Sequence, residues 1–322
     1  MARLSFSLLF TSFLVFSPVQ AAGLKFLQLP DNQDGTSIEA AVWSPCDEPA
    51  QDMQIRAFTI PAARDCPITK EGLPLIIFSH GYGGWYLGHH DTAEALADSG
   101  FIVVAINHPQ ANYADMSRAN GIPALVKRPR DIKTTIDFML SGFADAEKVD
   151  PQRIGFYGFS QGGFTGLVIA GAAPDFSKLP PRCTGSETVG CEGGKAHPRS
   201  VGQALTRDPR VKAMVISDPL SVVFQTESSV KDITIPVQLW QSEHGGGAGA
   251  SAQDVSLLRD VLLGKPDFRI ATNAIHLSFL TMCPQARMSS EVCRDAPGFD
   301  RASFHKTFNA EIVAFFQKHL AQ

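Results

Sequence analysis

Short, nearly continuous apolar runs alternate along this chain with longer segments in which apolar residues recur at helical spacing. The runs lie at 73–79, 101–106, 153–157, 211–216, 235–240 and 268–271. Such runs are typical of strands that are covered on both faces. The other segments predict helices near 91–99, 131–141, 163–171, 251–263 and 301–320. Strands that alternate with helices indicate βαβ units, so we predict an α/β fold with a mostly parallel central sheet and helices on both faces.

The region before the first of these runs has a different pattern. Segments 24–29, 37–43 and 53–60 predict strands without intervening helices, and we expect them to form an antiparallel N-terminal edge of the sheet. Farther on, Asp91 and Glu94 have the spacing of a capping box. Residues between 107 and 127 predict a loop.

Residues 1–21 predict a secretory signal peptide. Arg3 precedes an apolar run over 4–16, and the segment Val19-Gln20-Ala21 resembles a small-residue cleavage site. The run is short for a membrane span. We therefore predict an exported protein, periplasmic or secreted, whose mature chain over 22–322 forms one domain and does not insert stably into a membrane.

The cysteine pattern agrees with export. Six cysteines fall into three sequence-local pairs in loop-like regions, where an oxidising compartment favours disulfides, although spacing alone does not determine the connectivity. The predicted pairs are Cys46–Cys66, Cys183–Cys191 and Cys283–Cys293. Zinc binding is the alternative, but no pair has C-x-x-C spacing and no histidine pair completes a ligand set, so we predict no metal.

Net charge argues against one class of partner. The 322 residues carry a formal charge of −4, and no cluster of Lys and Arg is interleaved with aromatic residues. Binding to nucleic acid is therefore not expected.

Residues 158–162, Gly-Phe-Ser-Gln-Gly, match the pattern G-x-S-x-G between a predicted strand and a helix rich in small residues. A strand, a sharp turn and a helix form a nucleophile elbow, which lifts its serine above the sheet in a strained conformation. We predict Ser160 as the nucleophile. Gly158 and Gly162 are expected where strand and helix pass too close for a Cβ.

A serine hydroxyl needs a base, and the base needs a carboxylate that orients it. With an elbow of this kind, the acid and then the histidine follow the serine along the chain. His276 comes directly after the last predicted strand and is favoured as the base. The competing histidines, which are less well placed, are His244, His305 and His319.

Asp218 is the favoured acid, because it ends the predicted strand over 211–216. Glu243, just after the strand over 235–240, is the rival. Asp254 is less favoured because it lies within a predicted helix.

The oxyanion that develops during acyl transfer needs hydrogen-bond donors aimed at it. One is the backbone N–H of the residue after the serine, Gln161. A second glycine-rich turn, His80-Gly81-Tyr82-Gly83-Gly84, directly follows another buried strand. We favour the N–H of Tyr82 as the second donor, the alternative being a merely flexible turn.

Three segments carry a family resemblance: 78–84, 97–104 and 158–163. They resemble bacterial proteins described as dienelactone-hydrolase-like, which are similar to the platelet-activating-factor acetylhydrolases of the α/β-hydrolase superfamily. The resemblance implies the α/β-hydrolase fold and a Ser-Asp-His triad. It also supports Asp218 over Glu243 and Tyr82 as oxyanion donor. True dienelactone hydrolases use a cysteine nucleophile, so their reaction is not expected here.

These features predict a serine hydrolase that cleaves a small-molecule carboxylic ester through an acyl-enzyme, with no cofactor. The resemblance implies short-chain or lipid-like acetyl esters. The alternatives are a peptidase or an acyltransferase that uses the same triad, and an inactive binding protein with this fold.

Several flanking segments could shape the substrate pocket. The turn over 80–84 is followed by Trp85, Tyr86, His89 and His90, although the two histidines would also suit the start of a helix. Residues 243–250 either gate the site or connect two elements. The insertion over 174–209 is a candidate lid.

Overall fold

The computed structural model of this protein describes residues 22–30, 35–179, 205–247 and 249–321. The expected signal peptide, the pair Cys183–Cys191 and most of the candidate lid lie outside the described residues. Among the described residues, no helix is both long and apolar enough to cross a bilayer.

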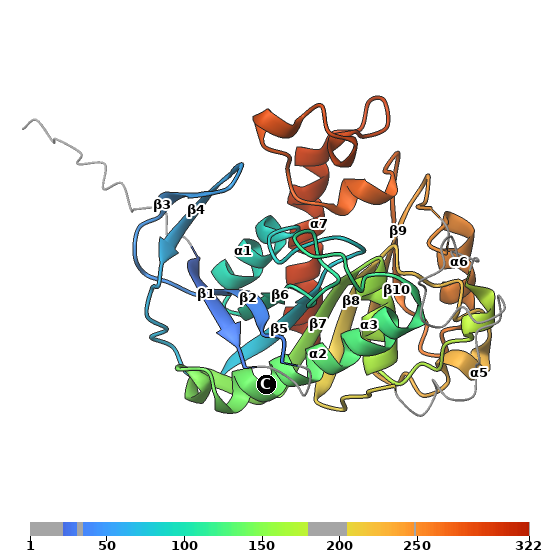
Figure 1. Ribbon diagram of the computed structural model, residues 1–322, viewed down its shortest axis with the longest axis horizontal. Coiled ribbons are helices and arrows are strands. Elements are labelled where there is room, and N and C mark those ends of the chain that lie inside the picture. The colour runs from blue at the N-terminus through green and yellow to red at the C-terminus, as the bar shows by residue number, and fades with distance from the viewer. Residues whose placement is uncertain (1–21, 31–34, 180–204, 248, 322) are drawn as a thin grey trace, which may run out of the picture.

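The strands form one ten-stranded sheet (Figure 1). They are β1 (Gly23–Leu29), β2 (Ile38–Ser44), β3 (Gln51–Ile55), β4 (Phe58–Arg64), β5 (Leu73–Ser79), β6 (Ile102–Ile106), β7 (Val149–Phe159), β8 (Val211–Ser217), β9 (Val237–Ser242) and β10 (Asp267–Ala271). Their order is β10-β9-β8-β7-β5-β6-β2-β1-β4-β3. All pairs from β10 to β6 are parallel, whereas β2 runs antiparallel to both β6 and β1.

The predicted α/β fold with a mostly parallel sheet is therefore confirmed, and its N-terminal edge differs in two details. Segment 53–60 forms two strands rather than one, because Arg56 adopts a positive φ of 57° in a turn between β3 and β4. In addition, β4 joins β1 through a short parallel pairing, so the edge is not purely antiparallel.

Helices cover both faces of the sheet. They are α1 (His90–Asp98), α2 (Gly121–Ser141), α3 (Gln161–Ile169), α5 (Glu227–Val230), α6 (Ala252–Val261) and α7 (Arg301–His319), with short 3-10 turns η1 (Ala146–Lys148), η2 (Phe176–Lys178), η5 (His276–Phe279), η6 (Gln285–Arg287) and η7 (Glu291–Cys293). Figure 1 shows α2 and α3 on one side of the sheet and α1 and α7 on the other.

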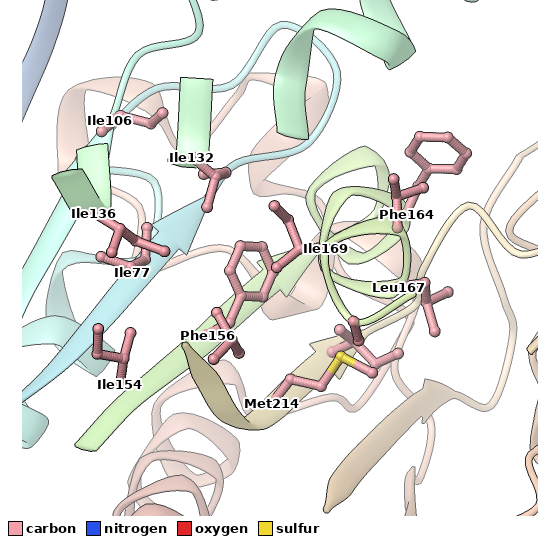
Figure 2. Close-up of a cluster of buried hydrophobic side chains, with 14 of the residues drawn as sticks. Ile77, Ile106, Ile132, Ile136, Ile154, Phe156, Phe164, Leu167, Ile169 and Met214 are labelled. Carbon is pink, nitrogen blue, oxygen red and sulfur yellow. The ribbon is translucent and has the colours of Figure 1, made fainter. Parts of the chain in front are cut away.

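Each face has its own apolar core. On the side of α2 and α3, Phe156 of β7 lies among isoleucines of α2 and the apolar side chains of α3 (Figure 2). On the other side, Leu96 of α1 and Phe308 and Phe316 of α7 pack against side chains of the sheet. Side chains of the central strands point alternately into both cores, which explains why these strands have continuous apolar sequences.

Helix α2 is longer than the sequence predicted, because it begins at Gly121 rather than near residue 131. Pro129 lies inside it, where a proline costs about 3 kcal/mol in a helix interior. Leu125, Ile132 and Ile136 are buried on the same face at helical spacing, and their burial offsets that cost. The segment 107–127 is therefore only partly a loop.

The sheet places the start of α3 against the end of β5. A Cβ added to Gly162 would lie 1.8 Å from the carbonyl oxygen of Ser79, and one added to Gly158 would lie 2.4 Å from the carbonyl oxygen of Gly162. No side chain fits at either position, as the sequence predicted.

We expect Gly162→Ala to lower the free energy of unfolding by at least about 3 kcal/mol, the upper end for an overpacked site. The atom that would clash is a backbone oxygen at the end of a central strand, which cannot move aside. Urea unfolding followed by circular dichroism measures the effect. Gly264→Ala is the matched control, because no atom lies within 4 Å of its added Cβ. Equal stabilities of the two variants would contradict the close approach.

Candidate active site

Ser160 lies at the sharp turn between β7 and α3. Its φ of 56° and ψ of −115° are strained for a residue with a side chain. The backbone holds this conformation at both sides, since Ser160 N–H donates to Ser217 O at 3.0 Å and Leu220 N–H donates to Ser160 O at 2.9 Å. This is the geometry of a nucleophile elbow.

Asp218 follows β8 and contacts His276, which opens η5 after β10. The distance from His276 Nδ1 to Asp218 Oδ2 is 3.1 Å. Asp218 is fully buried, its Oδ1 accepts from Ser242 N–H at 2.8 Å, and its Oδ2 accepts from the Ser242 hydroxyl. Because a carboxylate only accepts, it holds the proton of neutral His276 on Nδ1 and leaves Nε2 free to act as a base.

An aromatic ring next to Ser160 in the chain contacts His276. Phe159, the neighbour of Ser160, has its ring centroid 4.6 Å from that of His276. Among the described residues, the hydrogen bonds do not include one between the Ser160 hydroxyl and His276. In unliganded enzymes this contact is often long and tightens when substrate binds.

The competing residues have other partners. Glu243 is exposed and accepts from Asn273 N–H at 2.6 Å, and His244 Nε2 lies 3.1 Å from Asn273 Oδ1. Asp254 caps α6 through Ser251. His305 pairs with Asp91, and His319 ends α7. The geometry therefore favours Asp218 and His276.

Two backbone segments face the elbow. Gln161 is the first residue of α3, so its N–H has no acceptor within the helix. A Cβ added to Gly81 would lie 3.2 Å from Ser160 Cβ, which places the glycine-rich turn directly beside the serine. The backbone hydrogen bonds of the described residues include none donated by Tyr82 N–H. Both expected donors are thus near Ser160 and available.

The segment over 243–250 supports the histidine. His276 N–H donates to Gly245 O at 3.2 Å, and a Cβ added to Gly246 would lie 2.7 Å from His276 Nδ1. Gly245 and Gly246 of this segment therefore pack against the imidazole ring.

The predicted pocket residues after the turn over 80–84 differ in their exposure to solvent. Trp85 and Tyr86 are partly exposed, whereas His89 and His90 are buried at the start of α1. His89 Nδ1 donates to Phe279 O at 3.0 Å, and burial lowers the pKa of His89 to about 4, so its ring is neutral. The two histidines therefore belong to the helix start.

The turn that carries His276 is held by α7. Ser278 donates to Asp295 at 2.6 Å, and Arg301 donates to both carboxylate oxygens of Asp295 at 2.9 Å. The disulfide Cys283–Cys293 closes the adjoining loop, and Cys46–Cys66 is also formed. Two of the three predicted disulfides are thus confirmed.

His305, one turn along α7, reaches the same segment. Its Nε2 lies 2.9 Å from Ser278 O and its Nδ1 lies 2.6 Å from Asp91 Oδ2. Both partners are acceptors, so the ring must donate from both nitrogens and carry a positive charge. Asp91 therefore pairs with His305 and does not form the predicted capping box. No sequence pattern indicated the contact between Asp91 and His305.

No group of three or more His, Cys, Asp or Glu side chains within the described part of the chain is arranged to hold a metal ion.

Comparisons with known proteins identify chains that this protein resembles. Residues 66–185 match the family model BD-FAE. The chain is 29% identical over 126 residues to “Putative esterase NocK” of Nocardia uniformis subsp. tsuyamanensis, a match that covers 38% of this chain. The matched part is only 35% of the length of that curated relative.

Solved structures match nearly the whole chain. A ferulic acid esterase from Streptomyces cinnamoneus has a TM-score of 0.63 at 19% identity, over 95% of this chain and 92% of the other. A dienelactone hydrolase from Anabaena variabilis has a TM-score of 0.52 at 12% identity, over 92% and 98%. An esterase from Pyrobaculum calidifontis has a TM-score of 0.51 at 15% identity, over 92% and 84%. These likenesses, at identities of 12–19%, show that the chain has the α/β-hydrolase fold.

Replacing Asp91 by Asn should destabilise the fold at neutral pH, because protonated His305 would lose its buried counter-ion. Burial alone would raise the pKa of Asp91, but the hydrogen bond and charge of His305 outweigh it and hold the pKa well below its usual range. A carboxyl whose folded pKa is depressed contributes stability above its unfolded pKa and loses it as pH falls through the folded pKa. We expect a loss of about 1.5–3 kcal/mol at pH 7, which shrinks below about pH 4.

Urea unfolding of wild type and variant at pH 7 and pH 3 measures this difference. Asp260→Asn is the control, because that carboxylate pairs with Arg259 on the surface. A loss for Asp91→Asn that is the same at both pH values would show that ionisation of Asp91 is not its cause.

Proposed function

We propose that this protein is an exported serine hydrolase that cleaves carboxylic esters, with Ser160 as nucleophile, His276 as general base and Asp218 as the orienting acid. The main support is the hydrogen bond between buried Asp218 and His276 beside the strained elbow of Ser160. The esterase names of the sequence relative and of two structural neighbours support the reaction class.

The reaction follows from this arrangement. Ser160 Oγ adds to the ester carbonyl carbon while its proton passes to His276 Nε2, and the carbonyl oxygen becomes an oxyanion. The N–H groups of Tyr82 and Gln161 donate to that oxyanion. Its collapse breaks the bond to the alcohol, which takes the proton from His276. Water then repeats the sequence on the acyl-enzyme and releases the acid.

The substrate class we propose is a short-chain or lipid-like acetyl ester, a choice that rests on the family resemblance described above. The matched ferulic acid esterase makes esters of ferulic acid a second class to compare.

Export is supported by the two disulfides of the described residues, since disulfides persist in oxidising compartments. It also rests on the sequence pattern of residues 1–21.

We expect a fluorophosphonate to label the mature protein once, at Ser160, and 4-nitrophenyl acetate to be hydrolysed. Ser160→Ala should abolish labelling, and His276→Ala should reduce hydrolysis by about 10⁴-fold or more, because the serine loses its base. Intact mass and peptide mapping identify the labelled residue, and Ser228→Ala, a change to an exposed serine, serves as the control. Well-folded wild type that is neither labelled nor active would overturn the proposal and favour a binding protein.

The choice of acid has its own test. Asp218→Asn should lower kcat by about 10⁴-fold with the fold intact, because the amide no longer holds the imidazole in the required tautomer. Glu243→Gln should leave kcat within about threefold, since exposed Glu243 accepts its hydrogen bond from the backbone N–H of Asn273 and not from His276. The reverse ranking in ester hydrolysis would assign the acid to Glu243.

A further inference from the structure

A cluster of buried polar side chains lies behind the oxyanion loop, residues 80–84. Its members are Ser79, His80, His108, Arg128 and Asp131, each no more than 3% exposed. Burying an arginine and an aspartate costs several kcal/mol each unless their partners compensate. The proposed chemistry uses none of these side chains, and no sequence motif indicated His108, Arg128 or Asp131.

His80 binds the carbonyl of its own neighbour. Its Nδ1 lies 2.6 Å from Gly81 O, and its Nε2 lies 3.2 Å from the backbone N of His108. A carbonyl can only accept and a backbone N–H can only donate, so the ring carries its proton on Nδ1. Burial, together with the charge of Arg128, lowers the pKa of His80 well below its ordinary value, which keeps this neutral tautomer in place.

That hydrogen bond sets the orientation of a peptide plane. In a trans peptide, the C=O of one residue and the N–H of the next point in opposite directions, and the described chain has no cis peptide. Gly81 O is held by His80 Nδ1–H and by Gly84 N–H at 3.2 Å. The N–H of Tyr82 must therefore point to the other side of the loop, away from the buried cluster.

Arg128 fixes the preceding carbonyl. Its Nη2 donates to His80 O and lies 3.4 Å from Ser79 Oγ, while its Nε lies 3.3 Å from Thr165 Oγ1 of α3. Burial lowers the pKa of Arg128 to about 9, so the side chain is still charged at neutral pH. Two consecutive carbonyls of the oxyanion loop are thus bound from the same buried side.

A chain of hydrogen bonds completes the support. Ser79 Oγ lies 2.9 Å from His108 Nε2, and His108 Nδ1 lies 2.9 Å from Asp131 Oδ2. The other oxygen of Asp131 accepts from Lys127 Nζ at 2.7 Å. This order repeats that of a catalytic triad, but its burial excludes substrate, and it anchors the end of β5 instead.

We propose that His80 and Arg128 are positioning residues, which aim the N–H of Tyr82 at the oxyanion by binding the carbonyls of Gly81 and His80 from behind. The inference rests on the proposed function, because it assigns a purpose to the oxyanion loop. If His80 and Arg128 have this role, they stabilise the transition state more than they contribute to substrate binding.

The test compares His80→Leu, which removes the donor, with His80→Asn, whose side-chain amide can place an N–H near the position of Nδ1. For 4-nitrophenyl acetate, we expect His80→Leu to lower kcat by about 100-fold, the effect of losing one oxyanion donor, with little change in KM. The affinity for an aryl trifluoromethyl ketone should fall by a similar factor. Ser160 Oγ adds to the carbonyl carbon of this ketone, and the serine proton passes to His276. The ketone oxygen becomes an oxyanion that faces the proposed donors. His80→Asn should recover most of both losses.

Met139→Ala is the control for general destabilisation, because it opens a cavity on the same helix as Arg128, three turns away. It should unfold at lower urea concentration but keep wild-type kcat and inhibitor affinity. The proposal is overturned if His80→Leu keeps both properties, or if Met139→Ala loses them to the same extent.

A readout without substrate separates this proposal from the proposed function. The chain has only four tyrosines, so ¹⁵N-tyrosine labelling resolves the Tyr82 amide in NMR spectra. Its residual dipolar coupling should change in His80→Leu and return in His80→Asn. An unchanged coupling would overturn the positioning role. An inactive wild type with the expected couplings would overturn only the ester hydrolase.

Discussion

The backbone contact between Gly162 and Ser79 sets the geometry of the candidate site. It brings the first turn of α3 against the carboxyl end of β5, where a Cβ would lie 1.8 Å from a carbonyl oxygen. Ser160 precedes α3 and the oxyanion loop follows β5, so this one contact determines how far the serine lies from its expected donors. Because both sides of the contact are backbone, the distance depends on the sheet and does not change with side-chain rotamers.

The two faces of the sheet support different halves of the site. On the side of α2 and α3, Arg128 and the neutral imidazole of His80 hold the oxyanion loop. On the side of α1 and α7, Arg301 and the charged ring of His305 hold the turn that carries His276. In both halves, buried donors bind backbone carbonyls or a carboxylate, so local backbone freedom is removed before substrate arrives.

Besides the Asp91–His305 pair, two hydrogen-bonded Asp-His pairs of the described residues lie near a serine, and burial distinguishes them. The arrangement of Ser79, His108 and Asp131 is fully enclosed, with both contacts at 2.9 Å. In the other, Asp218 is enclosed but the His276 side chain is 17% exposed at the sheet edge. A reacting serine must meet substrate and water, which supports the set with the partly exposed His276 as the proposed triad.

Sequence alone determined the features that depend on neighbouring residues. The elbow around Ser160, the order of buried strands and the position of His276 after the last strand follow from local backbone requirements and from spacing. Only the tertiary structure decided what depends on packing between distant segments. It placed Asp218 against His276, extended α2 through Pro129, and brought Arg128 and His80 together behind the oxyanion loop. The physical reason is that residue spacing encodes local conformation, whereas burial and the meeting of polar groups are set by how the sheet and its helices pack.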